Sequence, residues 1–176
     1  MKKLKSTWYN MAIVLTAIAV VAGAALGYVN DITAPTIKAL KEKQEKQAEQ
    51  EVLAGQEGTA IKITDPKGFG GALTVMVGLA GDGTILGYKV LESSETPGLG
   101  AKAQDWFQKG PKGDVIGKQA GNLTVSKDGG EVDAITASTI TSRAFLRCIN
   151  EAYKTLSESS ADGQSGASKQ ASDNNI

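Results

Sequence analysis

The sequence of 176 residues contains no histidine, a single cysteine and few aromatic residues. Without histidine, none of its serines or threonines can have the imidazole base that most hydroxyl nucleophiles of hydrolases use, although a lysine base remains open. The one cysteine, Cys148, excludes an internal disulfide and a cysteine-ligated cluster made by this chain alone. A structural zinc site is not expected either. We therefore predict no catalytic residue and no metal site.

Charge and glycine content further limit the partners and the fold class that the protein can have. The 19 acidic and 19 basic residues balance, so the sequence has no excess of positive charge for binding nucleic acid, and we expect no such partner. The 21 glycines favour short strands joined by tight turns over a bundle of helices. The length suits one domain of ordinary size with appendages.

The amino-terminal segment is a candidate membrane span. Three lysines among the first five residues precede an uncharged, mostly apolar stretch, residues 11–29. As a helix it would be roughly 28 Å long, close to the thickness of the bilayer hydrocarbon. The alternative is a cleaved signal peptide, because residues 22–24 are small, but the apolar region of a signal peptide is usually only about 7 to 15 residues long. The lysines favour a cytoplasmic amino terminus. We predict a single-pass protein of the inner membrane, in contact with lipid, with its carboxy-terminal domain in the periplasm.

Four parts follow from the composition. Residues 1–30 hold the lysines and the anchor, and residues 31–55 are a polar connector, helical from Thr36 to Ala54 because helix formers fill it up to Gly55. The folded domain is predicted at 56–156. The tail at 157–176, rich in serine, glycine, aspartate and asparagine, is expected to be disordered.

The folded part reads as α+β, an antiparallel sheet with flanking helices. Two apolar runs flank residues 80–83, which predicts a hairpin, and the alternation in residues 73–79 predicts a strand buried on one face. A second hairpin is predicted to turn at residues 128–130. A last helix is predicted at 142–156, with Cys148 on its apolar face, where packing is the expected role of a free cysteine.

Two stretches could carry function. The first, ESSETPGLGAK at 92–102, contains Pro97-Gly98, a pair suited to the centre of a type II turn. Such a turn can be a plain connection, or it can expose backbone groups to a planar ring. The second, DAITASTITS at 133–142, precedes the last helix, where Thr139, Thr141 or Ser142 could cap the helix. The amino end of a helix is also a natural seat for phosphate. From the residues alone, both alternatives stay open.

The two stretches together resemble the flavin-carrying subunit of the Rnf electron-transport complex, and are similar to the related flavin-carrying subunit of the sodium-pumping NADH:quinone oxidoreductase. The resemblance extends over the lysine-flanked span, the polar connector, the hairpin with its GDG turn, ETPGLG and the hydroxyl cluster. It implies that FMN is attached through its phosphate, as a phosphoester, to the last threonine of a motif D-x-x-S/T-G-A-T. A separate flavin transferase makes that bond from FAD and magnesium.

Mapped onto this chain, the resemblance implies Thr139 as the acceptor, with Asp133 and Thr136 as the earlier motif positions. Ala137-Ser138 stands where the family has Gly-Ala. If that glycine takes a positive φ, Ala137 is strained by roughly 1 kcal/mol or more. Ser138 adds a hydroxyl and becomes a minor rival acceptor. The residues implied to border the isoalloxazine ring, or to support its loop or charge, are Glu95, Thr96, Gly98, Leu99 and Lys102.

The function implied is a membrane-anchored electron carrier with covalent FMN in an ion-translocating ferredoxin:NAD oxidoreductase. Its partners would be the other membrane and peripheral subunits and, transiently, the flavin transferase. It would be a redox subunit that is not catalytic alone. The alternatives are the corresponding subunit of the quinone reductase, and a membrane-anchored binding or assembly protein whose hydroxyl cluster only caps a helix.

Overall fold

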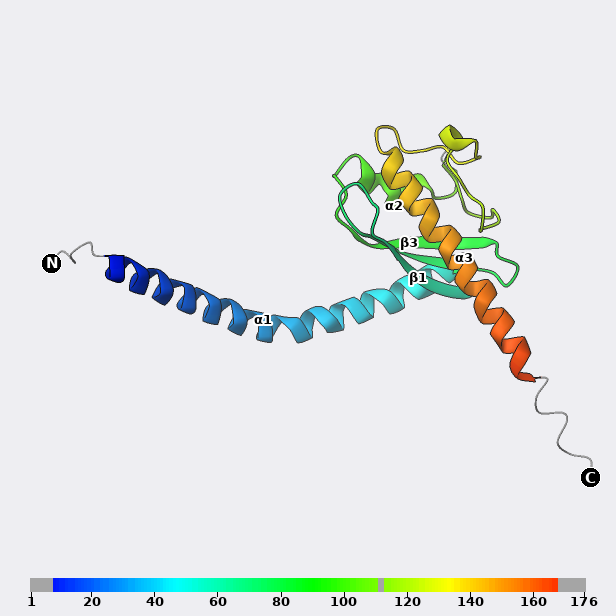
Figure 1. The fold of residues 1–176 in the computed structure, drawn as a ribbon. Helices are drawn as coiled ribbons and strands as arrows, with labels where there is room; N and C mark the ends of the chain where they lie inside the picture. Colours follow the sequence, from blue (N-terminus) through cyan, green and yellow to red (C-terminus); the bar gives the residue numbers. More distant parts are fainter. Residues whose placement is uncertain (1–7, 111–112, 168–176) are drawn as a thin grey trace, which may run out of the picture. The chain divides into compact units, whose positions relative to one another are not determined.

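The computed structural model describes residues 8–110 and 113–167, with side chains as far as residue 160 (Figure 1). The chain divides into two compact units, Met1–Gln44 and Glu45–Ile176. The lysines before the predicted span, and residues 168–176 of the predicted tail, lie outside the described residues.

The long amino-terminal helix α1 (Trp8–Leu53) covers both the predicted span and the predicted connector helix. It continues through Pro35, so the span and the connector helix, which were predicted separately, form one helix. Proline removes one intrahelical hydrogen bond, and the helix formers after it extend the helix. The described helix is long and apolar enough to cross a membrane, a test that a signal sequence also passes. α1 ends where Ala54 and Gly55 take left-handed backbone angles, φ 47° and 75°.

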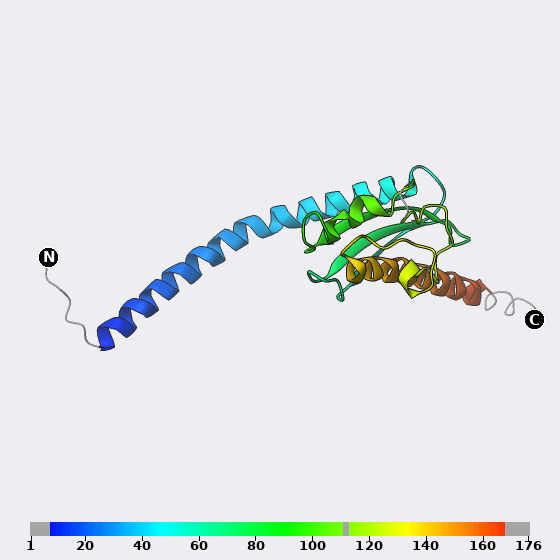
Figure 2. The same cartoon turned by 90° about the horizontal axis from the view of Figure 1, so that it is seen from above.

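A three-stranded antiparallel sheet forms the centre of the second unit. Its strands are β1 (Thr59–Asp65), β2 (Leu73–Leu79) and β3 (Ile85–Ser93), in the spatial order β1-β2-β3. The predicted hairpin joins β2 to β3, with Asp82 Oδ1 accepting a hydrogen bond from Thr84 N at 2.9 Å. Figure 2 shows helix α3 (Thr139–Ala167) below the sheet and the end of α1 above it. The α+β fold with flanking helices is therefore confirmed.

The main core lies between the sheet and α3. β2 contributes its odd-numbered side chains, Leu73, Val75, Val77 and Leu79, all fully buried. Phe145 of α3 stacks on Phe107, with ring centroids 4.2 Å apart, and meets Tyr88 edge-on at 4.7 Å. The Tyr88 hydroxyl donates to the carbonyl oxygen of Ala103, at 2.9 Å, and accepts from Phe107 N. These contacts hold the short helix α2 (Ala103–Trp106) against the sheet.

The other face of β2 is buried as well, so the expectation of one buried face was wrong. Met76 packs there against Ala48 and Val52 from the last turns of α1. Gly78 and Gly87 lie opposite each other in the β2–β3 register. A Cβ on either would come within 2.7 Å of the Val52 carbonyl oxygen, so the glycine pair lets the helix backbone lie directly on the sheet.

The predicted second hairpin is also wrong. Residues 123–135 form no strand pair; they contain the 3-10 helix η2 (Ser126–Asp128) and an isolated parallel bridge between Val125 and Val132. Both valines are buried in the main core. The apolar alternation therefore reflects burial of single side chains, and Gly129, with φ 86°, turns the chain too tightly for a ladder.

Helix α3 differs from its predicted range at both ends. It begins at Thr139, three residues before the predicted start, which places Thr139 in the first turn. It continues to Ala167, so residues 157–167, expected in the tail, extend the helix.

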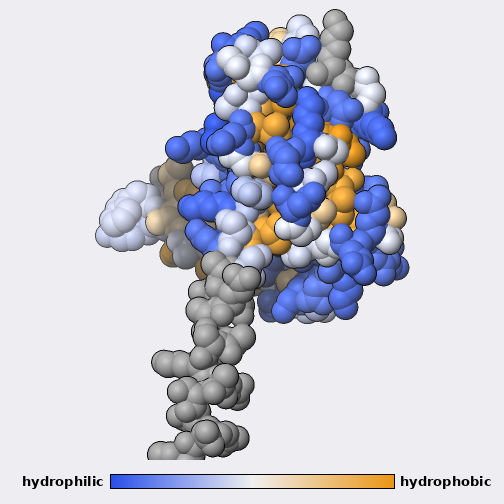
Figure 3. Space-filling view, turned by 90° about the vertical axis from the view of Figure 1, so that its right-hand side faces the viewer, coloured by the Kyte–Doolittle hydropathy of each residue, from blue (hydrophilic) through white to orange (hydrophobic). Residues whose placement is uncertain are grey.

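Figure 3 shows one face of the molecule, where hydrophobic residues form small patches between hydrophilic ones.

Candidate functional site

The fold brings the two stretches together around one cavity of about 360 Å³. One wall comes from the segment between β3 and the 3-10 helix η1 (Gly100–Lys102), and the other from the start of α3. The lining residues are Phe69, Glu95, Thr96, Leu99, Gly100, Ala137, Ser138, Thr139, Ile140 and Thr141. Sites for small molecules are commonly about 300 to 1,000 Å³, so the cavity is of suitable size.

The first stretch forms the predicted turn. Leu99 N donates to the carbonyl oxygen of Thr96 at 3.1 Å, and Gly98 between them has φ 78°, as the third position of a type II turn requires. Thr96 and Leu99 therefore line the cavity. Gly98 shapes the turn without lining it, and Lys102 is exposed at the end of η1, also outside the lining.

The second stretch is fixed by Ser142, whose hydroxyl is fully buried. It accepts a hydrogen bond from Ile135 N at 3.0 Å and donates to the Ser138 carbonyl oxygen at 2.9 Å. Ser142 N donates to the same carbonyl, which makes Ser138 the residue that precedes the helix. Ser142 thus ties the approaching loop to the first turn.

The capping interpretation fails in the part of the chain that the structure describes. Thr139 Oγ1 accepts from Lys127 Nζ, Thr141 Oγ1 has no partner, and Ser142 bonds as described above. None of these three hydroxyls accepts a hydrogen bond from a backbone NH of the first turn. The first NH groups of any α-helix have no intrahelical partner, so these remain open to a ligand.

Ala137 has φ 62°, which is left-handed backbone. The conditional expectation of strain at this position is confirmed. A non-glycine residue pays about 1 kcal/mol or more for this conformation. The turn that presents Ser138 and Thr139 to the cavity requires it, which is a physical reason for glycine at this position.

Two buried polar atoms of the cavity wall lack partners. Glu95 is 8% exposed and Thr141 is fully buried, and neither Glu95 Oε1 nor Thr141 Oγ1 forms a hydrogen bond. A Cβ on Gly100 would lie 2.4 Å from Glu95 Oε2 and 2.8 Å from Thr141 Oγ1, so this glycine keeps the space beside both groups open. Buried polar groups are nearly always satisfied in folded proteins, so an unsatisfied pair in a cavity points to a ligand.

Five lining residues were not among the predicted site residues: Phe69, Gly100, Ala137, Ile140 and Thr141. Phe69 is 70% exposed and Ile140 49% exposed, and with Leu99 at 41% they form an apolar rim. Phe69 lies in the run Gly68-Phe69-Gly70-Gly71, and an aromatic residue among glycines, outside any apolar pattern, was the available signal. For Ile140 and Thr141 the only signal was their place in the hydroxyl cluster.

Two predicted residues lie away from the cavity lining. Asp133 is half-buried, and its carbonyl oxygen accepts a hydrogen bond from Trp106 Nε1 at 2.8 Å. Thr136 is exposed in the loop before Ala137. Asp133 thus anchors the loop through its backbone, and the structure gives no described partner to its carboxylate. The cavity brings together Glu95, Thr96, Leu99, Ser138 and Thr139 from the predicted set.

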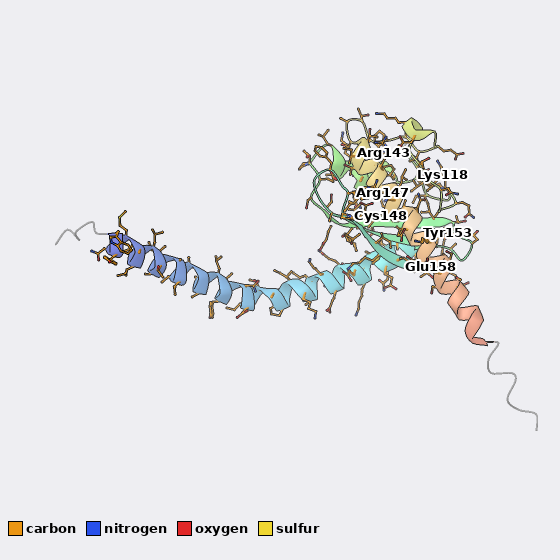
Figure 4. The ribbon with its side chains drawn as sticks, in the orientation of Figure 1. Lys118, Arg143, Arg147, Cys148, Tyr153 and Glu158 are labelled. Atoms are coloured by element: carbon orange, nitrogen blue, oxygen red, sulfur yellow. The ribbon has the colours of Figure 1, made fainter. Side chains whose placement is uncertain are left out.

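A second, larger cavity lies farther along α3. This groove has a volume of about 850 Å³ and runs between α3, β1 and the segment 120–122. Figure 4 shows Arg147, Cys148 and Tyr153, which line it, in order along the helix. Arg147 donates two hydrogen bonds to Asp65, at 2.6 and 3.2 Å. Burial raises the pKa of the Cys148 thiol to about 12, so the thiol is protonated and packs as a core side chain.

The folded unit is an FMN-binding domain. Residues 68–154, from the loop before β2 to the middle of α3, match the FMN-binding domain family, so the folded unit belongs to this family. Both walls of the smaller cavity lie within the matched residues.

Within this class the chain is similar to proteins named as the G subunit of an ion-translocating oxidoreductase complex. It is 39% identical to the one from Vibrio atlanticus over 103 residues, which are 56% of this chain and 49% of the relative. It is 40% identical to that of Yersinia pestis over 97 residues (53% and 46%), and 38% identical to that of Escherichia coli K12 over 96 residues (52% and 47%). The chain spans a little under half the length of these relatives. The resemblance seen in the sequence is thereby confirmed.

The residues of the cavity fit FMN chemically. The exposed rim of Phe69, Leu99 and Ile140 offers apolar surface to a flat aromatic ring. The unpartnered oxygens of Glu95 and Thr141 can bond ring-edge or ribityl donors. The open NH groups of the first turn of α3 suit a phosphate.

Proposed function

We propose that this chain is a membrane-anchored electron-transfer subunit of an Rnf-type ion-translocating oxidoreductase, with FMN attached covalently to Thr139. The observation that carries the proposal is the position of Thr139 in the cavity lining, in the first turn of α3. The same cavity holds two unsatisfied buried polar atoms, Glu95 Oε1 on the opposite wall and Thr141 Oγ1 two residues after Thr139. The similarity to the oxidoreductase subunits of Vibrio atlanticus and Yersinia pestis supports the choice of complex.

Each group of lining residues has its own task in this proposal. Glu95 and Thr141 orient the polar part of the cofactor, and Phe69, Leu99 and Ile140 shield its ring from water. The start of α3 holds the phosphate with backbone NH groups and the positive end of the helix dipole. Bound FMN supplies the redox chemistry by accepting and passing on electrons, and the protein sets its place and surroundings.

Attachment would be the work of a separate flavin transferase that uses FAD. The Thr139 hydroxyl oxygen forms a bond to the FMN phosphorus of FAD, and the bond from that phosphorus to the bridging oxygen breaks. AMP leaves with that bond's electron pair. The hydroxyl proton passes to a base of the transferase, which explains how a chain without histidine can carry such a modification. Thr139 is half-buried and so open to an external enzyme.

The proposed location is the inner membrane, with α1 as a single span in lipid, a cytoplasmic amino terminus and a periplasmic FMN domain. The apolar part of α1 supports the span. The remaining partners would be the other membrane and peripheral subunits of the complex. The proposed division keeps residues 1–30 as the anchor, 31–55 as the connector and 56–156 as the FMN-binding domain.

Intact mass spectrometry of the full chain in detergent, expressed with and without a flavin transferase, tests the attachment. We expect an added mass of FMN less water only with the transferase, and its loss in Thr139→Ala. Thr155→Ala is the matched control, because Thr155 lies on the same helix and bonds only the Glu151 carbonyl oxygen.

Three other outcomes would change the proposal. Addition that survives Thr139→Ala but is lost in Ser138→Ala or Thr136→Ala would move the link to that residue. No addition in the wild type, with a transferase active on a control substrate, would refute the covalent carrier. Loss of the addition in Thr155→Ala as well would show a general folding defect, which circular dichroism would reveal.

A further inference from the structure

A lysine from outside both predicted stretches contacts Thr139. Lys127, in the 3-10 helix η2, donates a hydrogen bond from Nζ to Thr139 Oγ1 at 3.2 Å. A lysine ammonium usually pairs with a carboxylate, yet among the described residues Lys127 forms no ion pair. It points instead at a neutral hydroxyl.

The loop that carries Lys127 is fixed from two sides. Asp128 accepts two hydrogen bonds from Arg143, at 2.6 and 2.7 Å, and Arg143 lies one turn after Thr139 at the beginning of α3 (Figure 4). On the other side, Ser126 N donates to the Val132 carbonyl oxygen at 2.8 Å, next to the buried Val125. The main chain at Lys127 is therefore held in place, while its side chain is free to reach Thr139.

The carboxylate next to Lys127 in the sequence is already paired. The bidentate pair with Arg143 keeps the pKa of the Asp128 carboxyl below its usual range and neutralises that carboxylate. Lys127 is then left as a positive charge beside the first turn of α3, whose partial charge is also positive. Two positive groups around one hydroxyl destabilise each other slightly, and an anion at Thr139 would relieve this.

We propose that Lys127 is a positioning residue that carries the counter-charge of a phosphate linked to Thr139, and that the Asp128–Arg143 pair holds it there. This inference rests on the proposed attachment at Thr139. It adds a residue from outside both sequence motifs and a specific role: the ammonium first orients the acceptor hydroxyl and then pairs with a phosphate oxygen in the product.

Two measurements on the full chain, in a detergent that contains no phosphorus, test this role. The first is the initial rate of flavin loading by a transferase with FAD, followed by intact mass. The second is the ³¹P NMR resonance of the loaded chain at pH 7. Lys127→Gln removes the charge and Lys127→Arg keeps it. Lys154→Gln is the control, because it removes a charge from the exposed distal part of α3, where Lys154 lies 3.7 Å from Glu151.

We expect Lys127→Gln to load roughly three- to tenfold more slowly, as the loss of one solvent-exposed hydrogen bond predicts. Its phosphorus resonance should shift from that of the wild type. Lys127→Arg and Lys154→Gln should match the wild type in both measurements. A merely structural role of the loop would not move the phosphorus resonance.

The opposite results separate this inference from the attachment itself. Normal loading and an unchanged resonance in Lys127→Gln would overturn the role of Lys127 while leaving Thr139 as the acceptor. Slow loading with an unchanged resonance would assign Lys127 to contact with the transferase and also overturn it. Equal slowing in Lys127→Gln and Lys127→Arg would overturn the need for charge. A wild-type chain that never loads would refute both proposals.

Discussion

Helix α3 borders two cavities that differ in volume and also in whether their buried polar groups have hydrogen-bond partners. The groove at its middle is the larger, about 850 Å³, and the cavity at its start has about 360 Å³. In the groove, Asp65 is bonded to Arg147 and Asn150 to backbone groups of the facing segment. In the smaller cavity, Glu95 and Thr141 hold the only buried side-chain oxygen or nitrogen atoms without a partner among the described residues.

The difference separates polar groups that stabilise the fold from polar groups kept for a ligand. A satisfied group has already recovered the cost of its burial, whereas an unsatisfied one costs about 1 to 3 kcal/mol until a ligand bonds it. The smaller cavity is thus the better candidate site although the groove is larger. Removal of an unsatisfied polar group should consequently stabilise the fold, whereas removal of a satisfied one should destabilise it.

The largest effect is expected from Gly100→Ala, which fills the smaller cavity. The new Cβ would meet Glu95 and Thr141 side-chain atoms at less than 3 Å. We expect the free energy of unfolding to fall by about 2 kcal/mol, as overpacking usually costs, and flavin loading to fall with it. Urea unfolding of the full chain in detergent measures the first effect.

Gly98→Ala is the control for this change. Gly98 has positive φ but open space around it, so the cost should be backbone strain alone, about 1 kcal/mol. Equal losses at both glycines would mean that the space beside Glu95 and Thr141 is not sterically restricted.

Breaking the ion pair of the groove should cost about 1 to 2 kcal/mol. Asp65 is buried and Arg147 is half-exposed, so the value for Asp65→Asn lies between those of surface and buried pairs. Burial alone would raise the pKa of the Asp65 carboxyl, but the hydrogen bonds from Arg147 and Lys67 N outweigh it and hold the pKa below its usual value.

The lowered pKa gives this pair a specific pH dependence. A carboxyl with a lower pKa in the folded state stabilises the fold above its unfolded pKa, about 3.9, and loses this contribution as the pH falls through the folded value. Urea midpoints measured between pH 6 and 2.5 should therefore converge for wild type and Asp65→Asn at the acid end. A constant difference over this range would contradict the pairing.

Opposite signs are expected for two buried threonines. Thr141→Val removes an unpartnered hydroxyl and should stabilise the flavin-free chain by about 1 kcal/mol, while it weakens flavin loading. Thr74→Val removes a hydroxyl that is bonded to Thr64 Oγ1 at 3.0 Å, and should destabilise by about 0.5 to 1 kcal/mol. Changes of the same sign in the free energy of unfolding of both variants would contradict the distinction between the two kinds of polar group.

The smallest effect is expected from Ala137→Gly. Glycine adopts φ 62° without the Cβ penalty, so the variant should gain about 0.5 to 1 kcal/mol. Ala101→Gly, at an exposed position without positive φ, should instead lose a few tenths of a kcal/mol. A loss of stability in Ala137→Gly would show that the left-handed turn is not strained.

Local signals predicted what local chemistry determines. The apolar run before Tyr28, the hairpin at 80–83 and the turn at Pro97-Gly98 all follow from patterns within a few residues, and the structure contains the helix, the hairpin and the turn. The pairing of two distant stretches came from resemblance, since no spacing rule brings residues 95–99 to residues 138–141.

The errors occurred where a tertiary contact decides. The valines at 125 and 132 alternate like strand residues, yet each fills a separate place in the core, and the backbone between them makes a tight turn. Ser142 lies where a helix cap is expected, but its hydroxyl accepts a hydrogen bond from Ile135 N, which belongs to the preceding loop and not to the first turn of the helix. The hydrogen bond from Lys127 to Thr139 had no sequence signal, because it depends on how the loop at 126–128 is anchored to α3.

The glycine pair Gly78–Gly87 determines how short an expressed fragment of the domain can be. Val52 lies directly on these glycines, and Ala48 lies beside Met76. The residues from Glu45 onward therefore belong to the folded unit. A fragment that begins at Gly55 would encode a sheet with one bare apolar face, prone to aggregation during expression. A fragment that begins at Glu45 or earlier would keep that face covered, so a soluble form of the domain must include the last turns of a helix that composition alone assigns to the connector.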